Sequence, residues 1–295
     1  MNNTIYVDIY IKKVMCSKFS KKINYKLFTE DFTKESVYIL GLLWADGTVS
    51  KKTNSISIEC IKEDVDVFKP IFDTVGDFNY YVRHRDNRSP QATLNCSSLE
   101  LSTFLKENDY DKKSLLSPNK ILKVIPEILH KYFYLGWSDG DGCFYYSKDF
   151  KTKQFIMSGT FNQDWSSFED LCKTLNVYYI INKFETKKGH KYSRFLISRN
   201  DGILSFGDFI YEKENSIGLK RKFDKFNSIK NYVKEKESYT YICYKNNEKI
   251  KGFPSLKSAS DWLDRGRYVG GSINDSIIGR QPTAYGYKWE KVSTQ

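Results

Sequence analysis

Two acidic residues have the type and placement to do chemistry, because each ends a short apolar run and is followed at once by glycine. Asp46 closes "VYILGLLWADG", and Asp141 closes "YFYLGWSDGDG" in the second half of the chain. Carboxylate oxygens suit hard divalent cations, Mg²⁺ above all, and facing carboxylates that share metal ions can support phosphodiester hydrolysis. Asp-Gly is also a common turn dipeptide. The hypothesis of a metal site therefore rests on the matched pair of acids.

The apolar runs before the acids predict two helices that pack against each other. In both runs small residues stand four positions apart, namely Gly41 with Ala45 and Gly136 with Gly140. This spacing lets two helix backbones approach closely, so both carboxylates would emerge side by side at one end. A carboxylate at the C-terminal end of a helix is disfavoured by about 0.3–1 kcal/mol, and a local rule broken twice indicates function. Gly47 and Gly142 predict glycine stops just past the helix ends.

The segments that follow the two acids repeat in outline, which indicates an internal duplication. Each predicted helix is followed by an alternating, strand-like run, then an apolar-periodic helix and a basic pair of strand-like runs. Each half closes on a helical pattern with lysines, "LSTFLKENDYDKKS" in the first and "ILSFGDFIYEKENSIGLKRKF" in the second. The order of elements predicts an α+β fold made of two related halves.

Composition narrows the class of protein. The 295 residues include 40% hydrophobic residues, enough for an ordinary core, and carry a formal net charge of +11, which favours a polyanionic partner. No apolar run approaches the length needed to span a bilayer, so no membrane association is expected. The six cysteines form no Cys-x-x-Cys pair and there are only three histidines, which disfavours a zinc site and indicates reduced thiols in an intracellular protein.

Basic residues recur at matching places in the two halves and are candidates for contacts with nucleic acid. They are Arg83, Arg85 and Arg88 in the first half, and Lys187, Lys188, Lys191 and Arg194 in the second. A charge run is usually a solvated face. These basic residues are interleaved with Tyr80, Tyr81 and Tyr192 on alternating strands, which favours contacts with phosphates and bases instead.

Past about residue 230 the sequence changes in style. "KNYVKEKE" is typical of a linker or of a continuing exposed helix, and "YTYICYKNNEKIKGF" predicts a hairpin with "NNEK" at its tip. Two short helices follow, for which Ser258 with Asp261 and Ser272 with Asp275 have the spacing of capping boxes. A last aromatic strand, "AYGYKWEKV", ends a module that is too small for an enzyme.

At this point the residues resemble a known family. "ILGLLWADG" and "YLGWSDGDG" are similar to the two signature motifs of single-chain LAGLIDADG homing endonucleases, over roughly residues 30–230. The resemblance implies two pseudo-symmetric αββαββα half-domains whose motif helices form the central interface, with sheets that straddle DNA. Trp44 replaces the first acidic position of the motif, and Ser138 stands where an apolar residue is usual.

The resemblance also implies roles for individual residues. Asp46 and Asp141 would be the metal-binding catalytic acids, using Mg²⁺ or Mn²⁺ to cut one strand each. Lys62 resembles the basic residue near the scissile phosphates, and in the second half its position would hold Gln163 or Asn162. Lys220 and Arg221, in "LKRKF", are similar to a basic segment late in many members. The tail looks like a modular DNA-binding repeat of intron-encoded nucleases, with Lys257 and Arg280 as candidate DNA contacts; a small structural cap is the alternative.

Together these inferences predict a monomeric, DNA-associated endonuclease that hydrolyses double-stranded DNA at a long site, as in intron homing. The expected divisions are an N-terminal extension (1–29), two half-domains (30–126 and 127–230), a linker (231–239) and the DNA-binding module (240–295). The alternative is a non-cutting member: a maturase that binds intron RNA, or a DNA-binding regulator on the same scaffold. Retention of both acids favours cutting, since a binder has no need of two carboxylates facing a phosphate.

Overall fold

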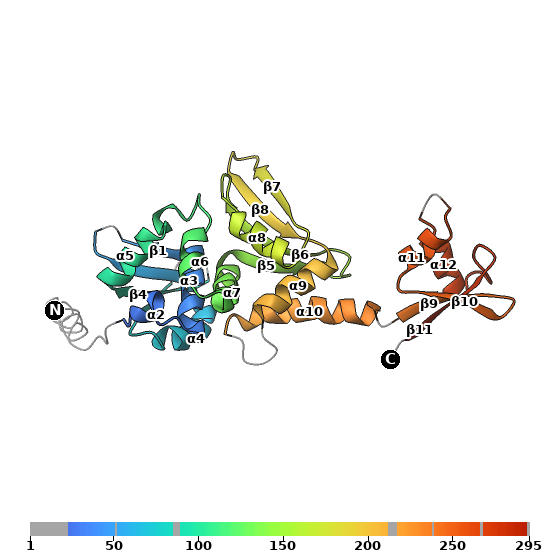
Figure 1. The fold of residues 1–295 in the computed structure, drawn as a ribbon, viewed down its shortest axis with the longest axis horizontal. Coiled ribbons are helices and arrows are strands. Elements are labelled where there is room, and N and C mark those ends of the chain that lie inside the picture. Colours follow the sequence, from blue (N-terminus) through green and yellow to red (C-terminus); the bar gives the residue numbers. More distant parts are fainter. Residues whose placement is uncertain are drawn as a thin grey trace, which may run out of the picture. The chain divides into compact units, whose positions relative to one another are not determined.

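The computed structural model describes residues 23–50, 52–84, 89–211, 217–237, 239–265 and 268–293. The chain divides between Phe226 and Asn227, within helix α10 (Lys220–Glu237), into two compact units. The first unit holds the two halves that the duplication predicts, and the second holds the C-terminal module (Figure 1). Residues 231–237, expected as a linker or a continuing helix, belong to α10.

The two halves of the first unit have the same order of elements. In the first half these are α3 (Lys34–Asp46), β1 (Gly47–Val49), β2 (Ser55–Ile61), α4 (Lys62–Asp73), β3 (Asn79–Arg83), β4 (Gln91–Ser97) and α5 (Leu99–Glu107). In the second half these are α7 (His130–Asp141), β5 (Gly142–Tyr146), β6 (Lys153–Thr160), α8 (Ser166–Thr174), β7 (Ile180–Glu185), β8 (Lys191–Ile197) and α9 (Asn200–Ile210). The predicted α+β fold of two αββαββα halves is confirmed.

Short elements flank and join the halves. They are α2 (Lys26–Thr29) before the first half, and η1 (Tyr110–Lys112), α6 (Asn119–Val124) and η2 (Glu127–Leu129) between the halves. In both sheets every neighbouring pair of strands is antiparallel, and the strand orders correspond: β1-β2-β4-β3 and β5-β6-β8-β7.

Each half has its own core between one face of its sheet and its helices. Ile56, Ile58 and Leu94 supply buried side chains from the first sheet, and Phe155 and Phe195 do so from the second. Alternation along the strands leaves the other residues on the opposite face. Helix α3 is buried on nearly every side, as expected of a helix between two half-cores, and a capping box of Thr33 and Ser36 fixes its start.

The second unit contains β9 (Tyr239–Lys245), β10 (Glu248–Phe253), α11 (Leu256–Trp262), α12 (Gly270–Ile277) and β11 (Lys288–Ser293). Its sheet has the order β10-β9-β11 and packs on a core that includes Phe253, Ile273 and Trp289. The predicted hairpin tip is present: Asn246 and Asn247 both have positive φ, which suits a tight turn between twisted strands.

The capping boxes predicted in this unit were wrong by one turn. Ser255 is the N-cap of α11 and Ser258 is its third helical residue, so these two serines cap each other. Helix α12 starts at Gly270, after Val269 and without a side-chain cap, so that Ser272 lies inside the helix. Phe253 and Val269 enter the core just before each helix and set the starts earlier than the local sequence indicated. Within the described residues, no helix has the length and apolarity to cross a membrane.

Candidate active site at the ends of two packed helices

Helices α3 and α7 pack backbone to backbone through their small residues. A Cβ built on Gly41 would lie 2.1 Å from the carbonyl oxygen of Phe133, and one on Gly136 would lie 2.1 Å from that of Tyr38. A Cβ on Gly140 would lie 2.2 Å from the Cβ of Ala45. Real Cβ atoms do not approach so closely, so only glycine fits at these positions. The predicted contact between the two helices at Gly41 and Gly136 is confirmed.

The glycines after the acids act differently from the expectation. Gly47 (φ −72°) and Gly142 (φ −92°) are extended and begin strands β1 and β5, so neither is a left-handed helix stop. What excludes a side chain there is crowding. A Cβ on Gly47 would lie 2.5 Å from the Tyr110 hydroxyl, and one on Gly142 would lie 2.6 Å from the carbonyl oxygen of Ser138.

This packing brings the two acids together. A Cβ on Gly140, the residue before Asp141, would lie 3.2 Å from the Oδ2 atom of Asp46. The pKa of Asp141 is raised to about 6, chiefly by burial and in addition by the negative charge of Asp46. Asp46 is solvent-exposed by its surface area, yet crowding by protein atoms raises its pKa as well. Each carboxylate is thus held where its negative charge is disfavoured.

Two lysines, the half-buried Lys113 and the buried Lys222, offset this charge at the helix ends. The Lys113 ammonium donates to the carbonyl oxygens of Leu43 (3.1 Å) and Ala45 (2.6 Å) at the end of α3. The Lys222 ammonium donates to those of Ser138 (2.9 Å), Asp139 (2.6 Å) and Gly142 (2.7 Å) at the end of α7. Each lysine thus adds a donor at the carbonyls of a helix end, where those of Leu43 and Ser138 also accept from the N–H of the glycine that follows the helix, and places positive charge where the dipole is negative.

The same lysines act electrostatically on the acids. Burial lowers the pKa of Lys113 to about 8, and the nearby charges of Asp141 and Asp46 oppose that decrease. Burial also lowers the pKa of Lys222, with Asp139 opposing. In turn both lysines lower the pKa values of Asp46 and Asp141. Sequence reasoning missed these two residues, and the signal was present: both halves close on a lysine cluster.

Lys62, predicted as the basic residue near the scissile phosphates, stands apart from the cations beside the acids. Lys62 is exposed at the start of α4, and the cations that act on Asp46 in the described structure are Lys113 and Lys222. Strand register also identifies its counterpart. Gly47 pairs with Ile58 and Gly142 pairs with Met157, so the residue four positions further on, Lys62, matches Phe161. Both positions lie just past the ends of β2 and β6, and the second half has additional residues before α8, so the assignment of Gln163 or Asn162 stays a prediction.

Gln163 nevertheless lies at the site. It lines a cavity of about 180 Å³ together with Asp141, Lys113, Trp44 and Trp137. The Gln163 amide donates to the carbonyl oxygens of Lys113 and Leu116, both at 3.2 Å, which fixes it there. The Trp44 indole N–H is buried without a partner in this structure. The Asp141 side of the site therefore has a defined hollow next to the carboxylate.

The other acid of the second motif is structural. Asp139 is fully buried and accepts hydrogen bonds from the Tyr38 hydroxyl (2.7 Å) and the Leu219 backbone N–H (2.8 Å). It thereby joins α3 and the start of α10 to α7. Trp44 occupies the equivalent position in the first motif, two residues before the acid, so the replacement there leaves the pair Asp46 and Asp141 unaffected.

The basic candidates fall into three groups. Arg83, Lys187, Lys188, Lys257 and Arg280 are exposed, the last beside Asp275 at 3.3 Å. Others have acidic or aromatic neighbours: Lys191 with Glu185, Lys220 with Asp224, Arg221 bidentate to Asp64 (2.9 and 2.6 Å), and Arg194 over the rings of Phe184 and Tyr192. Arg85 and Arg88 lie outside the described residues.

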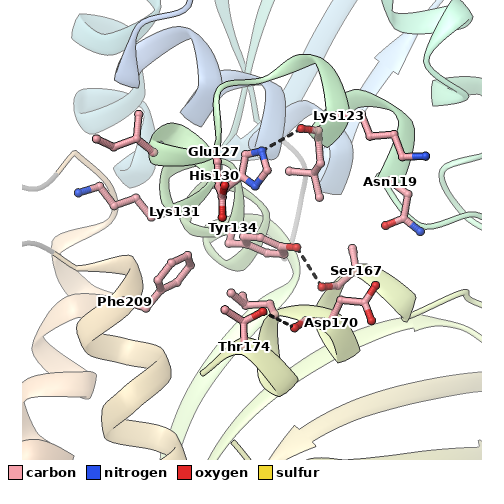
Figure 2. A pocket seen from close by; sticks show the side chains of 13 residues that line it. Asn119, Lys123, Glu127, His130, Lys131, Tyr134, Ser167, Asp170, Thr174 and Phe209 are labelled. Carbon is pink, nitrogen blue, oxygen red and sulfur yellow. Dashed lines mark hydrogen bonds between the residues drawn. The ribbon is translucent and has the colours of Figure 1, made fainter. Parts of the chain in front are cut away.

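A larger pocket lies at the opposite end of α7 and is a separate feature. Its volume is about 980 Å³, and His130, Tyr134 and Phe209 contribute to its lining (Figure 2). His130 begins the helix that Asp141 ends, and at 1.5 Å per residue the two positions are roughly 16 Å apart. The ring of His130 contacts the carbonyl oxygens of Leu122 and Ile125, and the Tyr134 hydroxyl donates to that of Ser167.

Comparison with known proteins gives structural matches only. No family model matches the sequence, and no curated protein matches it. Variants of the homing endonuclease I-DmoI match with a TM-score of 0.43 and 17% identity, over 63% of this chain and 100% of theirs. The I-LtrWI LAGLIDADG homing endonuclease bound to target DNA matches with a TM-score of 0.45 and 15% identity, over 69% and 92%. Full-length DUF199/WhiA from Thermatoga maritima matches with a TM-score of 0.43 and 14% identity, over 88% and 77%.

Proposed function

We propose that this protein is a site-specific, divalent-metal-dependent endonuclease of the homing type that cuts double-stranded DNA. The observation that carries the proposal is the pair of carboxylates, Asp46 and Asp141, at the adjoining ends of two glycine-packed helices. Burial disfavours the negative charge of both acids, and the charge of Asp46 adds to the cost of ionising Asp141, so a neutral residue would be more stable at either position. A function that needs both negative charges explains this placement.

The donor set fits Mg²⁺ or Mn²⁺. Within the described residues no cluster of three or more His, Cys, Asp or Glu side chains could hold a metal ion. Two carboxylates remain, and Mg²⁺ is commonly held by one or two carboxylates with water and substrate phosphates completing its shell. Cations bound there would activate water and stabilise the leaving oxygen of a phosphodiester. The raised pKa of Asp141 also fits, because a bound cation favours the ionised form.

The protein's own groups would position these parts. Asp46 and Asp141 hold the cations, one acid facing each DNA strand. Lys113 and Lys222 fix the helix ends that carry the acids and place positive charge beside the phosphates, where negative charge accumulates during hydrolysis. Gln163 defines one wall of the hollow beside Asp141. Lys62 would then contact the DNA backbone from its exposed position.

DNA would lie along the exposed faces of the two sheets, held at its phosphates by the exposed basic residues. Lys187 and Lys188 in the β7–β8 turn have exposed side chains that could do this, and so has Arg83 on β3, whose guanidinium donates to the Tyr81 hydroxyl at 3.0 Å. Arg85, Arg88, Lys191, Arg194, Lys220 and Arg221 remain candidates for the same role. The net charge of +11 supports a polyanionic partner. We further propose that residues 240–295 are a DNA-binding module, with Lys257 and Arg280 as phosphate contacts.

The test is selection of bound duplexes from a random pool, followed by incubation of the selected duplex with the protein, with and without Mg²⁺. The proposal predicts specific binding in both conditions and double-strand cleavage only with the metal ion. Specific DNA binding without cleavage in Mg²⁺ or Mn²⁺ would identify a DNA-binding regulator instead. Preference for structured RNA over any duplex would favour the maturase alternative.

A further inference from the structure

The two sheets expose faces of opposite chemistry. In each sheet one face is buried in the half-core, and residues directly opposite across neighbouring strands share a face. The other face of the first sheet has a row of four residues across its strands: Thr48, Ser57, Asn95 and Asn79. All four are exposed or half-buried. The row is polar throughout, with a hydrogen bond of 2.8 Å between Thr48 and Ser57 and one of 3.4 Å between Asn79 and Asn95.

The equivalent row of the second sheet is apolar. It consists of Cys143, Ile156, Leu196 and Ile180. Cys143 follows Gly142 as Thr48 follows Gly47, and the strand pairing from there places the other three residues. These residues too are exposed or half-buried. Ser57 therefore corresponds to Ile156, and Asn95 corresponds to Leu196. The duplication has kept the backbone and changed the chemistry of this row.

One further pair of positions follows the same trend, although the row between does not: there Glu59, Thr93 and Tyr81 correspond to Ser158, Arg194 and Asn182. Arg83 and Gln91, which pair on the first sheet, correspond to Phe184 and Tyr192 on the second, whose rings stack at 5.2 Å. In the described part of the second sheet, Arg194 is the charged side chain on this face. Its guanidinium lies over both rings, and its Nε atom has no partner in the structure. The second sheet thus exposes an apolar row and an aromatic pair, with polar side chains between them.

An exposed apolar row of this kind fits a particular feature of DNA. In the major groove, thymine presents a C5-methyl group, which isoleucine, leucine and phenylalanine can contact. Guanine and cytosine present donors and acceptors that such side chains would bury without partners, at a cost. Serine, asparagine and glutamine can instead hydrogen-bond to the edges of any base pair. Lys187 and Lys188, exposed where β7 turns into β8, place positive charge at the edge of the apolar sheet for phosphate contacts.

We propose that the second sheet recognises a thymine-rich half-site through methyl contacts from Ile156, Leu196 and Ile180, while the first sheet reads its half-site by hydrogen bonds. The inference rests on the proposed function insofar as the sheets face DNA. It adds that the two halves of the target differ in the chemistry by which they are read.

The experiment uses the full chain and duplexes selected from a random pool, with binding as the readout. Deoxyuridine, which lacks the C5-methyl group, replaces thymidine in one half-site at a time. Each contacted thymine replaced in the second half-site should weaken binding about fourfold, the equivalent of one buried methyl group. The same replacement in the first half-site should leave binding unchanged, which makes it the internal control.

Matched variants assign the half-sites. Ile156→Ser and Leu196→Asn give the second sheet the residues found at the equivalent positions of the first, on a surface where folding should tolerate them. Both should abolish the preference for thymine over uracil in one half-site and leave the other half-site unchanged. The reciprocal variant, Ser57→Ile, should create a thymine preference in the other half-site.

The outcomes separate this inference from the proposed function. Equal tolerance of uracil in both half-sites by a protein that binds and cuts its target would overturn the inference alone. Selective loss of binding on uracil substitution without any cleavage in Mg²⁺ would support the inference and overturn the nuclease. Failure to select any duplex would overturn both, and would leave the apolar row as a surface for a protein partner.

Discussion

Replacing Gly41 or Gly136 with alanine changes one hydrogen to a methyl group at the tightest point of the molecule. Alanine has a higher helix propensity than glycine, which by itself would stabilise each helix by about 1 kcal/mol. Against this, the new Cβ would lie 2.1 Å from a carbonyl oxygen of the facing helix, where contact needs more than 3.0 Å. The helices must therefore separate by about 1 Å along much of their buried length.

Overpacking of this kind costs roughly 1–3 kcal/mol and more where backbone must move, and here the obstacle is backbone on both sides. We expect the clash to exceed the propensity gain, with a net loss of about 2–4 kcal/mol for either variant. In a unit of this size, 1 kcal/mol shifts the Tm by roughly 2–4 °C, so the predicted decrease is about 4–16 °C. Leucine at either position should be worse.

Thermal unfolding followed by circular dichroism measures the effect. Gly271→Ala is the matched control, because a Cβ at this helical glycine meets no atom within 4 Å. That variant should be neutral, or should stabilise the C-terminal unit by up to about 1 kcal/mol. A Gly41→Ala or Gly136→Ala protein that melts at or above the parent's temperature would refute the close contact between the helices.

Three further predictions concern charge. Burial and Asp46 raise the pKa of Asp141 from 3.8 to about 6. The folded state therefore holds this proton more tightly than the unfolded chain does, and the stability of the metal-free protein should fall as the pH rises between those values. Asp141→Asn should therefore stabilise the metal-free protein by about 1–3 kcal/mol above pH 6 and not below 3.8, as a pH series of urea titrations would show; a pH-independent difference would contradict it. Lys222→Met removes a buried donor shared by the carbonyls of Ser138, Asp139 and Gly142, and a positive charge that acts on the buried Asp139. It should destabilise by about 2–5 kcal/mol in urea unfolding, whereas Lys220→Met, at an exposed neighbour, should be neutral; equal effects would argue against the capping role. Removing residues 238–295 should weaken DNA binding and reduce the slope of log K for DNA binding against log salt concentration by roughly 0.9 per lost phosphate contact. If the truncated and full-length proteins had the same slope and the same footprint, the C-terminal module would not hold DNA.

The features that sequence reasoning predicted well were those with a repeated local pattern. Glycine at matched spacing in two apolar runs predicted a close helix contact, and Gly41 and Gly136 both lie in it. The alternation of strands and helices predicted the two similar halves. Both inferences needed only short segments and the fact that each occurred twice.

The errors arose where distant parts of the chain decide the outcome. Lys113 and Lys222 lie far along the chain from the carbonyls they cap, and no local spacing connects them. Arg221, a candidate DNA contact, pairs with Asp64, a partner that only the tertiary fold brings near. Gly47 and Gly142 were interpreted as turn residues, although crowding by Tyr110 and Ser138 is what excludes a side chain. The match of Lys62 with Phe161 depends on strand register, which sequence alone left open.

The most direct test of the central claim is cleavage of the selected duplex by Asp46→Asn and Asp141→Asn proteins in Mg²⁺. Asparagine keeps the size of the side chain and removes the charge that a cation needs. We predict that neither variant makes double-strand breaks, while both bind the duplex within a few-fold of the parent. Double-strand cleavage at the parent's rate by both variants, with binding intact, would contradict the assignment of these two carboxylates as the catalytic centre.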